Sequence, residues 1–230
     1  MLNNLLKSIR SKSFVDPTKN IESEAFEVNN WIVSDFVAEC LVPIVGVRPF
    51  PLNELMLMTA TVCRFKPEII FEWGTNIGKS ARVFYEITKA FNIPAEIHSI
   101  DLPDEVFHNE HPKNKRGIMV KNCKAVTLHQ GDGIACSLKL IKEKNPKGNV
   151  LFFVDGDHSY ESVKKELETI LREIPDAVVL LHDTFFQSNE ANYNIGPFKA
   201  VTEVINKTGN KYHVLSTNMG LPGMSLVYKK

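Results

Sequence analysis

From Ile69 onward, short apolar runs alternate with longer stretches in which apolar residues recur every three or four positions. The short runs have the length of buried strands, and the longer stretches have the periodicity of amphipathic helices. Strands are predicted at 69–71, 95–101, 125–129, 150–154, 177–181, 211–215 and 224–228. Because strands and helices alternate through most of this region, we expect one α/β domain with a doubly wound, mostly parallel sheet and helices on both faces.

The segment before the first strand follows a helical pattern of its own. Residues 1–60 are expected to form an N-terminal helical extension or cap, and 61–230 the main domain. Helices are predicted over 2–9, 27–41 and 52–65. Pro43 is expected to stop the second helix, and the third should dock on the edge of the sheet. The extension serves either as scaffold or as a cap over a ligand pocket. A loop or a short irregular helix, longer than a simple connection, is predicted over 104–121, and a long loop is predicted over 185–197.

The turn after the first strand is small and polar, and a helical pattern follows it. Strand, glycine turn and helix form the first unit of nucleotide-binding sheets, where glycines let the backbone approach a ligand and the helix N-terminus offers free N–H groups. A phosphate loop is excluded because only three residues separate the glycines here, and the dinucleotide fingerprint lacks its second glycine. The candidate cofactor residues are Glu72, Gly74, Thr75, Asn76, Gly78 and Ser80.

Two aspartates end the second and third predicted strands. Asp101 follows the glycine turn at about the 20-residue distance expected of an acid that binds both ribose hydroxyls. Asp132, in a Gly-Asp-Gly sequence, should lie at the carboxyl edge of the sheet beside the same crevice. Either residue could instead cap the N-terminus of the helix that follows it.

Two later strands end in acids and histidines. The run at 150–154 leads into Asp155-Gly156-Asp157-His158, and the run at 177–181 leads into His182-Asp183-Thr184. Crowding such groups is costly unless they pair or are used. If the two strands are neighbours, Asp155 and Asp183 converge across one strand spacing, about 5 Å.

This pattern indicates metal-assisted chemistry. Two carboxylates with room for water suit Mg²⁺, and His182 is a candidate third ligand, although nitrogen suits a softer metal better. His158 could act as a general base, because imidazole titrates near neutral pH. In the alternative interpretation, Asp155 and Asp183 bond backbone groups at the strand ends and the histidines only pack.

Composition excludes several other classes. Lys+Arg and Asp+Glu are equal at 27 each, which argues against nucleic acid and anionic membranes as partners. No run is long enough to span a bilayer, and the N-terminus lacks the features of a signal peptide. The four scattered cysteines have no metal-binding spacing and are expected to be reduced thiols of a cytoplasmic protein.

Taken together, these motifs resemble those of class I S-adenosylmethionine-dependent methyltransferases. The stretch from Glu72 to Ser80 is similar to their first motif, E-x-G-x-x-x-G-x-S. V-D-G-D-H-S-Y-E-x-V, followed by V-V-L-L-H-D-T, resembles the family that contains macrolide-sugar O-methyltransferases and cephalosporin-hydroxylase-like proteins. The similarity extends from about Phe65 to the C-terminus.

The resemblance implies a Rossmann-like, seven-stranded sheet that ends in an antiparallel edge hairpin. It also implies that the strand-end acid and glycine turn hold the methionine part of the cofactor, and that Asp132 accepts from the adenine amino group. Asp155 and Asp183 fall on metal-ligand positions, Asp155 also falls in the cofactor site, and His158 falls on the proposed catalytic base. The sugar enzymes carry Glu where this chain has His182.

The expected function is S-adenosylmethionine-dependent methyl transfer to an oxygen of a small molecule, with a sugar hydroxyl as one candidate. Asp155 and His158 are the expected catalytic residues, and Mg²⁺ is a candidate cofactor. Association into a homo-oligomer is left open. The rival interpretations are a cofactor-binding protein without catalysis and a different reaction on the same fold, such as an NAD-dependent one.

Overall fold

Seven strands form one sheet in the order β3-β2-β1-β4-β5-β7-β6. The computed structural model describes residues 14–21, 25–106, 112–186 and 195–230, so the helix predicted over 2–9 and parts of both long loops lie outside it. The strands are β1 Ile69–Trp73, β2 Glu96–Asp101, β3 Val126–Gln130, β4 Val150–Val154, β5 Val178–His182, β6 Tyr212–Ser216 and β7 Met224–Lys229. All seven predicted strands are therefore confirmed, with ends shifted by two residues at most.

The sheet is parallel except at one strand. β3, β2, β1, β4 and β5 pair in parallel, whereas β7 is antiparallel to both β5 and β6. The predicted hairpin is thus present at the edge of the sheet. Its first strand, β6, is the edge strand, and its second strand, β7, lies between β6 and β5. Among the described residues, no helix is both long and apolar enough to cross a lipid bilayer.

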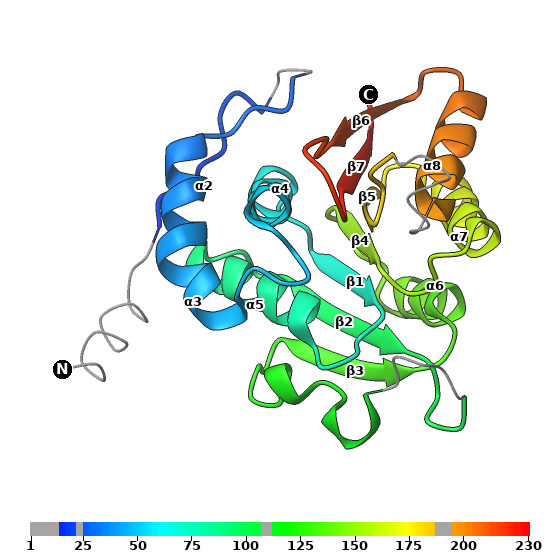
Figure 1. Ribbon diagram of the computed structural model, residues 1–230, viewed down its shortest axis with the longest axis horizontal. Helices are drawn as coiled ribbons and strands as arrows, with labels where there is room; N and C mark the ends of the chain where they lie inside the picture. Colours follow the sequence, from blue (N-terminus) through cyan, green and yellow to red (C-terminus); the bar gives the residue numbers. More distant parts are fainter. Residues whose placement is uncertain (1–13, 22–24, 107–111, 187–194) are drawn as a thin grey trace.

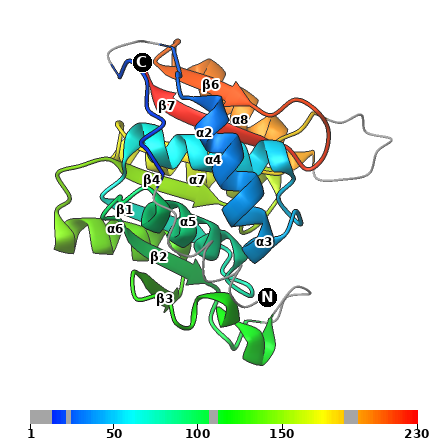
Figure 2. The ribbon, with the colours of Figure 1, turned by 90° about the vertical axis from the view of Figure 1, so that its left-hand side faces the viewer.

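Helices cover both faces of the sheet, with α2 to α5 on one side and α6 to α8 on the other (Figure 1). The α-helices are α2 Asn30–Phe36, α3 Val42–Val45, α4 Leu52–Phe65, α5 Lys79–Ala90, α6 Gly133–Lys144, α7 Tyr160–Glu173 and α8 Gly196–Lys207. A π-helical turn, η1 (Val37–Leu41), and two 3₁₀ turns, η2 (Lys113–Lys115) and η3 (Ile118–Val120), complete the described elements. In Figure 2, α2 and α3 lie over α4 and α5, which they contact.

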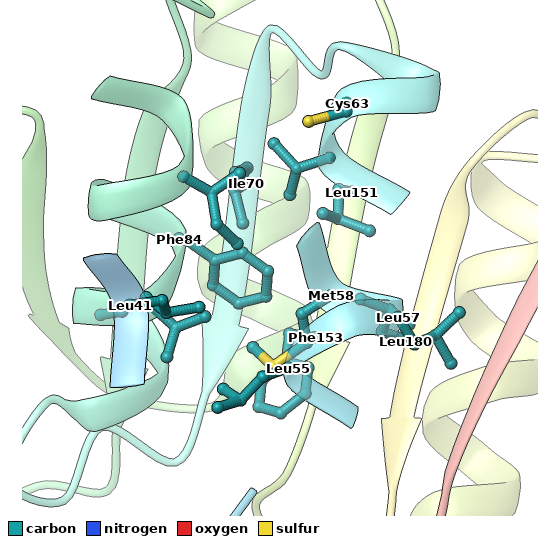
Figure 3. Packing of buried hydrophobic residues seen from close by; sticks show 14 of the residues in the cluster. Leu41, Leu55, Leu57, Met58, Cys63, Ile70, Phe84, Leu151, Phe153 and Leu180 are labelled. Carbon is teal, nitrogen blue, oxygen red and sulfur yellow. The ribbon is translucent and has the colours of Figure 1, made fainter. Parts of the chain in front are cut away.

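The central strands are buried on both faces, as parallel strands between two helical layers should be. Side chains alternate along β4, so that Phe153 joins the core under α4 and α5, while Phe152 joins the core under α7 and α8. Figure 3 shows the first core, in which Phe84 of α5 meets Phe153 edge to face at 5.4 Å between ring centroids.

Helix α4 lies on a face of the sheet. Its bounds agree with the prediction, but the expectation that it docks on the sheet edge was wrong. Leu55 and Met58 are buried in the same core as Ile70 of β1 and Phe153 of β4. The buried side chains of α4 span more of its surface than an edge contact would cover, which is why a central face accommodates it.

The helix predicted over 27–41 continues beyond its expected end. Its backbone stays helical through η1 and α3 to Val45, so the expectation that Pro43 stops it was wrong. At η1 the Val42 N–H bonds the Val37 carbonyl, a π-helical spacing that restarts the helix just before the proline. Pro43 then lies in the first turn of α3, where a missing N–H costs little.

Replacing Phe84 by Ala should lower the free energy of unfolding by about 3–5 kcal/mol, because this fully buried ring would leave a cavity between α5 and β4. The control is Trp31→Ala, since Trp31 is 82% exposed and should change stability by less than about 0.5 kcal/mol. Urea unfolding of both variants measures the difference. Equal losses in the two variants would contradict this description of the core.

Candidate active site

The glycine turn lies directly against the end of β4. Gly74 has a φ of +96°, and a Cβ atom there would lie 2.3 Å from the carbonyl oxygen of Asp155. Its N–H donates to the Ile100 carbonyl of β2 at 2.9 Å. Glycine is required at this position for both conformation and space, and it brings the turn into contact with the segment that carries the predicted catalytic residues.

A buried polar network supports the turn from below. The Glu72 carboxylate is fully buried and accepts hydrogen bonds from the hydroxyls of Ser80 and Ser99. The Ser99 hydroxyl also lies 2.6 Å from that of Thr75. Burial raises the pKa of Glu72 to about 7, against the hydrogen bonds from the two serines, which lower it. Three candidate cofactor residues, Glu72, Thr75 and Ser80, therefore also hold the turn to β2 and α5.

Asp101 joins the turn to the loop after β2. Its carboxylate accepts from the backbone N–H of Asn76 at 3.2 Å, from Leu102 N–H at 3.0 Å and from Arg116 Nε at 3.1 Å. Arg116 also bonds Asp104 and the Leu102 carbonyl. It was missed from the sequence because it lies in an irregular segment without periodicity.

The second glycine of the turn, Gly78, begins α5 with a φ of +85°.

Two other aspartates have a local structural role. Asp132 caps α6, with its side chain accepting from Ala135 N–H at 2.8 Å, which is the alternative that the sequence left open. A role toward adenine stays a prediction. Asp157 accepts from the backbone N–H of Ser159 at 2.9 Å and from the hydroxyls of Ser159 and Ser162, at the start of α7. This local role accounts for the second acid of the Asp-Gly-Asp-His sequence.

The remaining acids and histidines form one cluster at the carboxyl ends of β4 and β5. These strands are parallel neighbours, as predicted. His158 lies between the two aspartates, with Nδ1 3.2 Å from Asp183 Oδ2 and Nε2 3.5 Å from Asp155 Oδ1. His182 Nδ1 lies 2.9 Å from Asp155 Oδ1 and 3.6 Å from Asp183 Oδ2. The prediction that Asp155 and Asp183 converge is confirmed, and the structure also brings both histidines into the same cluster.

The charges in the cluster support one another. Hydrogen bonding to Asp155 and the charges of both aspartates raise the pKa of His158, although burial opposes this. Burial lowers the pKa of His182, but the charge of Asp155 and the bonds to Asp155 and Glu54 outweigh it and raise that pKa to about 10. For Asp155 the signs are opposite. Burial raises the pKa of this carboxyl, but the charges of the two histidines and their hydrogen bonds outweigh burial and lower the pKa. The aspartates therefore favour the protonated form of both imidazoles, and the imidazoles favour the ionised form of Asp155.

A buried acid from α4, Glu54, completes the cluster and was missed from the sequence. Its Oε2 lies 3.0 Å from His182 Nε2, and its side chain is fully buried. The available signal was periodicity: Glu54 precedes Met58 and Val62 by one and two helical repeats, which places it on the buried face of α4. Phe50 packs edge to face against the His182 ring, at 4.9 Å between centroids.

The donor atoms of Asp155, His182 and Asp183 lie within 4.8 Å of one another and fit a single cation. Two donors that are each about 2.1 Å from one ion lie roughly 3.0 Å apart at right angles and about 3.4 Å apart in a tetrahedron. The distances from His182 Nδ1 to the two carboxylates, 2.9 and 3.6 Å, bracket these values. The residues present therefore fit a divalent metal.

Comparison with known proteins identifies a family whose model matches most of the chain. Residues 45–219 match the family model described as Rhamnosyl O-methyltransferase/CmcI. The match includes α4 with Glu54 and every residue of the cluster. A search of curated proteins found no match.

Solved structures of methyltransferases share the fold. The SAH-bound methyltransferase PaMTH1 of Podospora anserina is 15% identical, with a TM-score of 0.55 and coverage of 100% of this chain and 95% of that one. CalS11, a TDP-rhamnose 3'-O-methyltransferase, is 16% identical, with a TM-score of 0.52 and coverage of 98% and 92%. An apo structure of CmcI is 16% identical, with a TM-score of 0.52 and coverage of 77% and 71%. At this identity the similarity shows a common Rossmann-like fold.

Replacing Glu72 by Gln should flatten the pH dependence of stability. Because the folded pKa of about 7 lies above the ordinary value of 4.5, the native protein holds this proton more tightly than the unfolded chain does. The resulting stabilisation is complete below the unfolded pKa and is lost as the pH rises through the folded pKa. As the pH rises from 4.5 to above 7, the free energy of unfolding of the wild type should therefore fall by roughly 1–3 kcal/mol more than that of the variant.

Urea unfolding of both proteins near pH 4.5 and above pH 7 measures this difference. Glu86→Gln is the control, because Glu86 is paired with Arg82 on α5 outside the network. A difference between wild type and Glu72→Gln that does not change with pH would contradict the assigned effect of burial.

Proposed function

The chain belongs to the Rhamnosyl O-methyltransferase/CmcI family, and we propose that it transfers a methyl group from S-adenosylmethionine to a hydroxyl oxygen of a small molecule. The observation that carries this proposal is the contact between the glycine turn and the cluster. Gly74 lies against the backbone of Asp155, whose side chain bonds His182 and lies beside His158. A cofactor held on the turn would therefore have its reactive end next to a candidate base.

The proposed cofactor site follows the carboxyl edge of β1, β2 and β3. Gly74 and Gly78 leave space for the methionine part, and Glu72, Thr75 and Ser80 keep the turn in place. Asp101 would receive the ribose hydroxyls, which would then compete with Arg116 for its carboxylate. Asp132, Asn76 and Asp155 would line the rest of the site.

The reaction is an in-line displacement in which the acceptor oxygen must be aligned with the methyl group and lose its proton. S-adenosylmethionine supplies the methyl group on a positively charged sulfur. His158 takes the hydroxyl proton, and Asp155 and Asp183, on either side of the ring, orient it and stabilise its protonated form. A divalent cation held by Asp155, His182 and Asp183 would lower the pKa of the hydroxyl.

A sugar hydroxyl is the proposed acceptor. The name of the family refers to rhamnosyl O-methyl transfer, and CalS11, which shares the fold, is a TDP-rhamnose 3'-O-methyltransferase. Sugar hydroxyls are weak acids, so a base and a cation at the same place suit them.

We propose a cytoplasmic location on the basis of the cysteines, which form no disulfide bond with one another in the described part of the chain.

Purified protein is expected to bind S-adenosylmethionine in a calorimetric titration. Asp101→Ala should weaken this binding by roughly 10–100-fold, as expected for the loss of hydrogen bonds to a charged group. Gly74→Ala should abolish it, because the new methyl group would meet the Asp155 carbonyl. Asp176→Ala is the control, since Asp176 pairs with Lys229 on the surface. No binding by folded wild-type protein would overturn the proposed function.

His158→Gln should lower kcat by about 10²–10⁴-fold while leaving the affinity for S-adenosylmethionine within about twofold of wild type. Formation of S-adenosylhomocysteine with a panel of nucleotide-linked sugars measures turnover. His213→Gln is the control, because His213 lies on β6 and stacks on Tyr228. Equal kcat in the wild type and the His158 variant would remove His158 as the base. Cofactor binding without turnover of any acceptor would favour the non-catalytic alternative.

A further inference from the structure

Glu54 is a buried acid that the reaction itself does not use. It is fully buried on α4, and its two carboxylate oxygens have different partners. Oε1 accepts from the backbone N–H of Gly223 at 2.8 Å, and Oε2 lies 3.0 Å from His182 Nε2. Because a buried carboxylate is costly without partners, this placement indicates a specific task.

That task concerns the orientation of His182. A metal ion would have to displace the proton that His182 Nδ1 shares with Asp155. Because Nε2 still donates its hydrogen to Glu54, the lone pair that this leaves is on Nδ1, which faces Asp155 and Asp183. Phe50 packs edge to face against the ring, and Phe153 lies near it, which limits its rotation. A carboxylate that receives the second N–H of an imidazole is the usual outer partner of a metal-binding histidine.

We propose that Glu54 is the positioning residue that makes His182 a metal ligand, and that the site therefore prefers Zn²⁺ or Co²⁺ to Mg²⁺. This inference rests on the metal site of the proposed function. Asp155 and Asp183 supply oxygen donors, which suit all of these ions, whereas the His182 nitrogen suits Zn²⁺ and Co²⁺ and is a poor ligand for Mg²⁺. The preference thus comes from one nitrogen donor and the acid that orients it.

The substitution Glu54→Gln tests the positioning role without changing the shape of the side chain. The backbone N–H of Gly223 requires an oxygen, so the amide nitrogen of Gln would face His182 Nε2. That nitrogen can only donate, which forces the ring proton onto Nδ1 and removes the donor from the metal site. Affinity for Co²⁺ should fall by roughly 10–100-fold, and affinity for Mg²⁺ should change much less.

The binding experiment uses full-length protein in the absence of S-adenosylmethionine. Co²⁺ binding is followed by the visible absorption of the ion, and Zn²⁺ and Mg²⁺ are measured by competition against Co²⁺. The wild type should bind Co²⁺ at least about 100-fold more tightly than Mg²⁺. His182→Glu should reduce that ratio by at least about tenfold, because it replaces the nitrogen with oxygen. Glu86→Gln is the matched control and should bind both ions as the wild type does.

Several results would overturn the inference. They are tighter binding of Mg²⁺ than of Co²⁺ by the wild type, no binding of any of the ions, or unchanged Co²⁺ affinity in folded Glu54→Gln protein. Absence of metal binding would mean that His182 is simply a buried cation between Glu54 and Asp155. If Glu54→Gln does not fold, the wild-type preference and His182→Glu still decide. A failure of the proposed function would appear instead in the separate titration, as absence of S-adenosylmethionine binding by folded wild-type protein.

Discussion

The chemistry of this protein depends on the pairing of β4 with β1 on one side and with β5 on the other. All three strands are buried along their whole length. A shift of register by one residue would move every side chain to the opposite face, so the apolar cores above and below fix the pairing. The same pairing sets Trp73 beside Val154 and Val154 beside Leu181, and the polar residues that follow must meet. Hydrophobic burial of the strands thus positions the charged groups at their ends.

The cluster is stable because its charges alternate. Three carboxylates, of Glu54, Asp155 and Asp183, lie around the imidazoles of His158 and His182. Each carboxylate has at least one imidazole neighbour, which offsets part of the cost of burial. Removal of a single partner would leave an uncompensated buried charge, a larger loss than removal of a whole pair. The five residues therefore act as one unit.

Continuous apolar runs made most of the fold predictable, because a buried parallel strand has few other sequence signatures. The residues at strand ends were predictable for the same reason, since parallel strands meet at one edge. Contacts between distant segments were not. Glu54 is 128 residues from His182, and helical periodicity indicates that it is buried without naming its partner. Pro43 was misread because a local rule for helix ends took no account of a π-helical turn.

The bond between Glu54 and Gly223 joins segments that are synthesised far apart in time, 169 residues from each other. Gly223 directly precedes β7, and its carbonyl accepts from Thr184, next to Asp183. The charged centre is therefore closed on this side only when Gly223 and β7, the last strand in the chain order, are in place against β5.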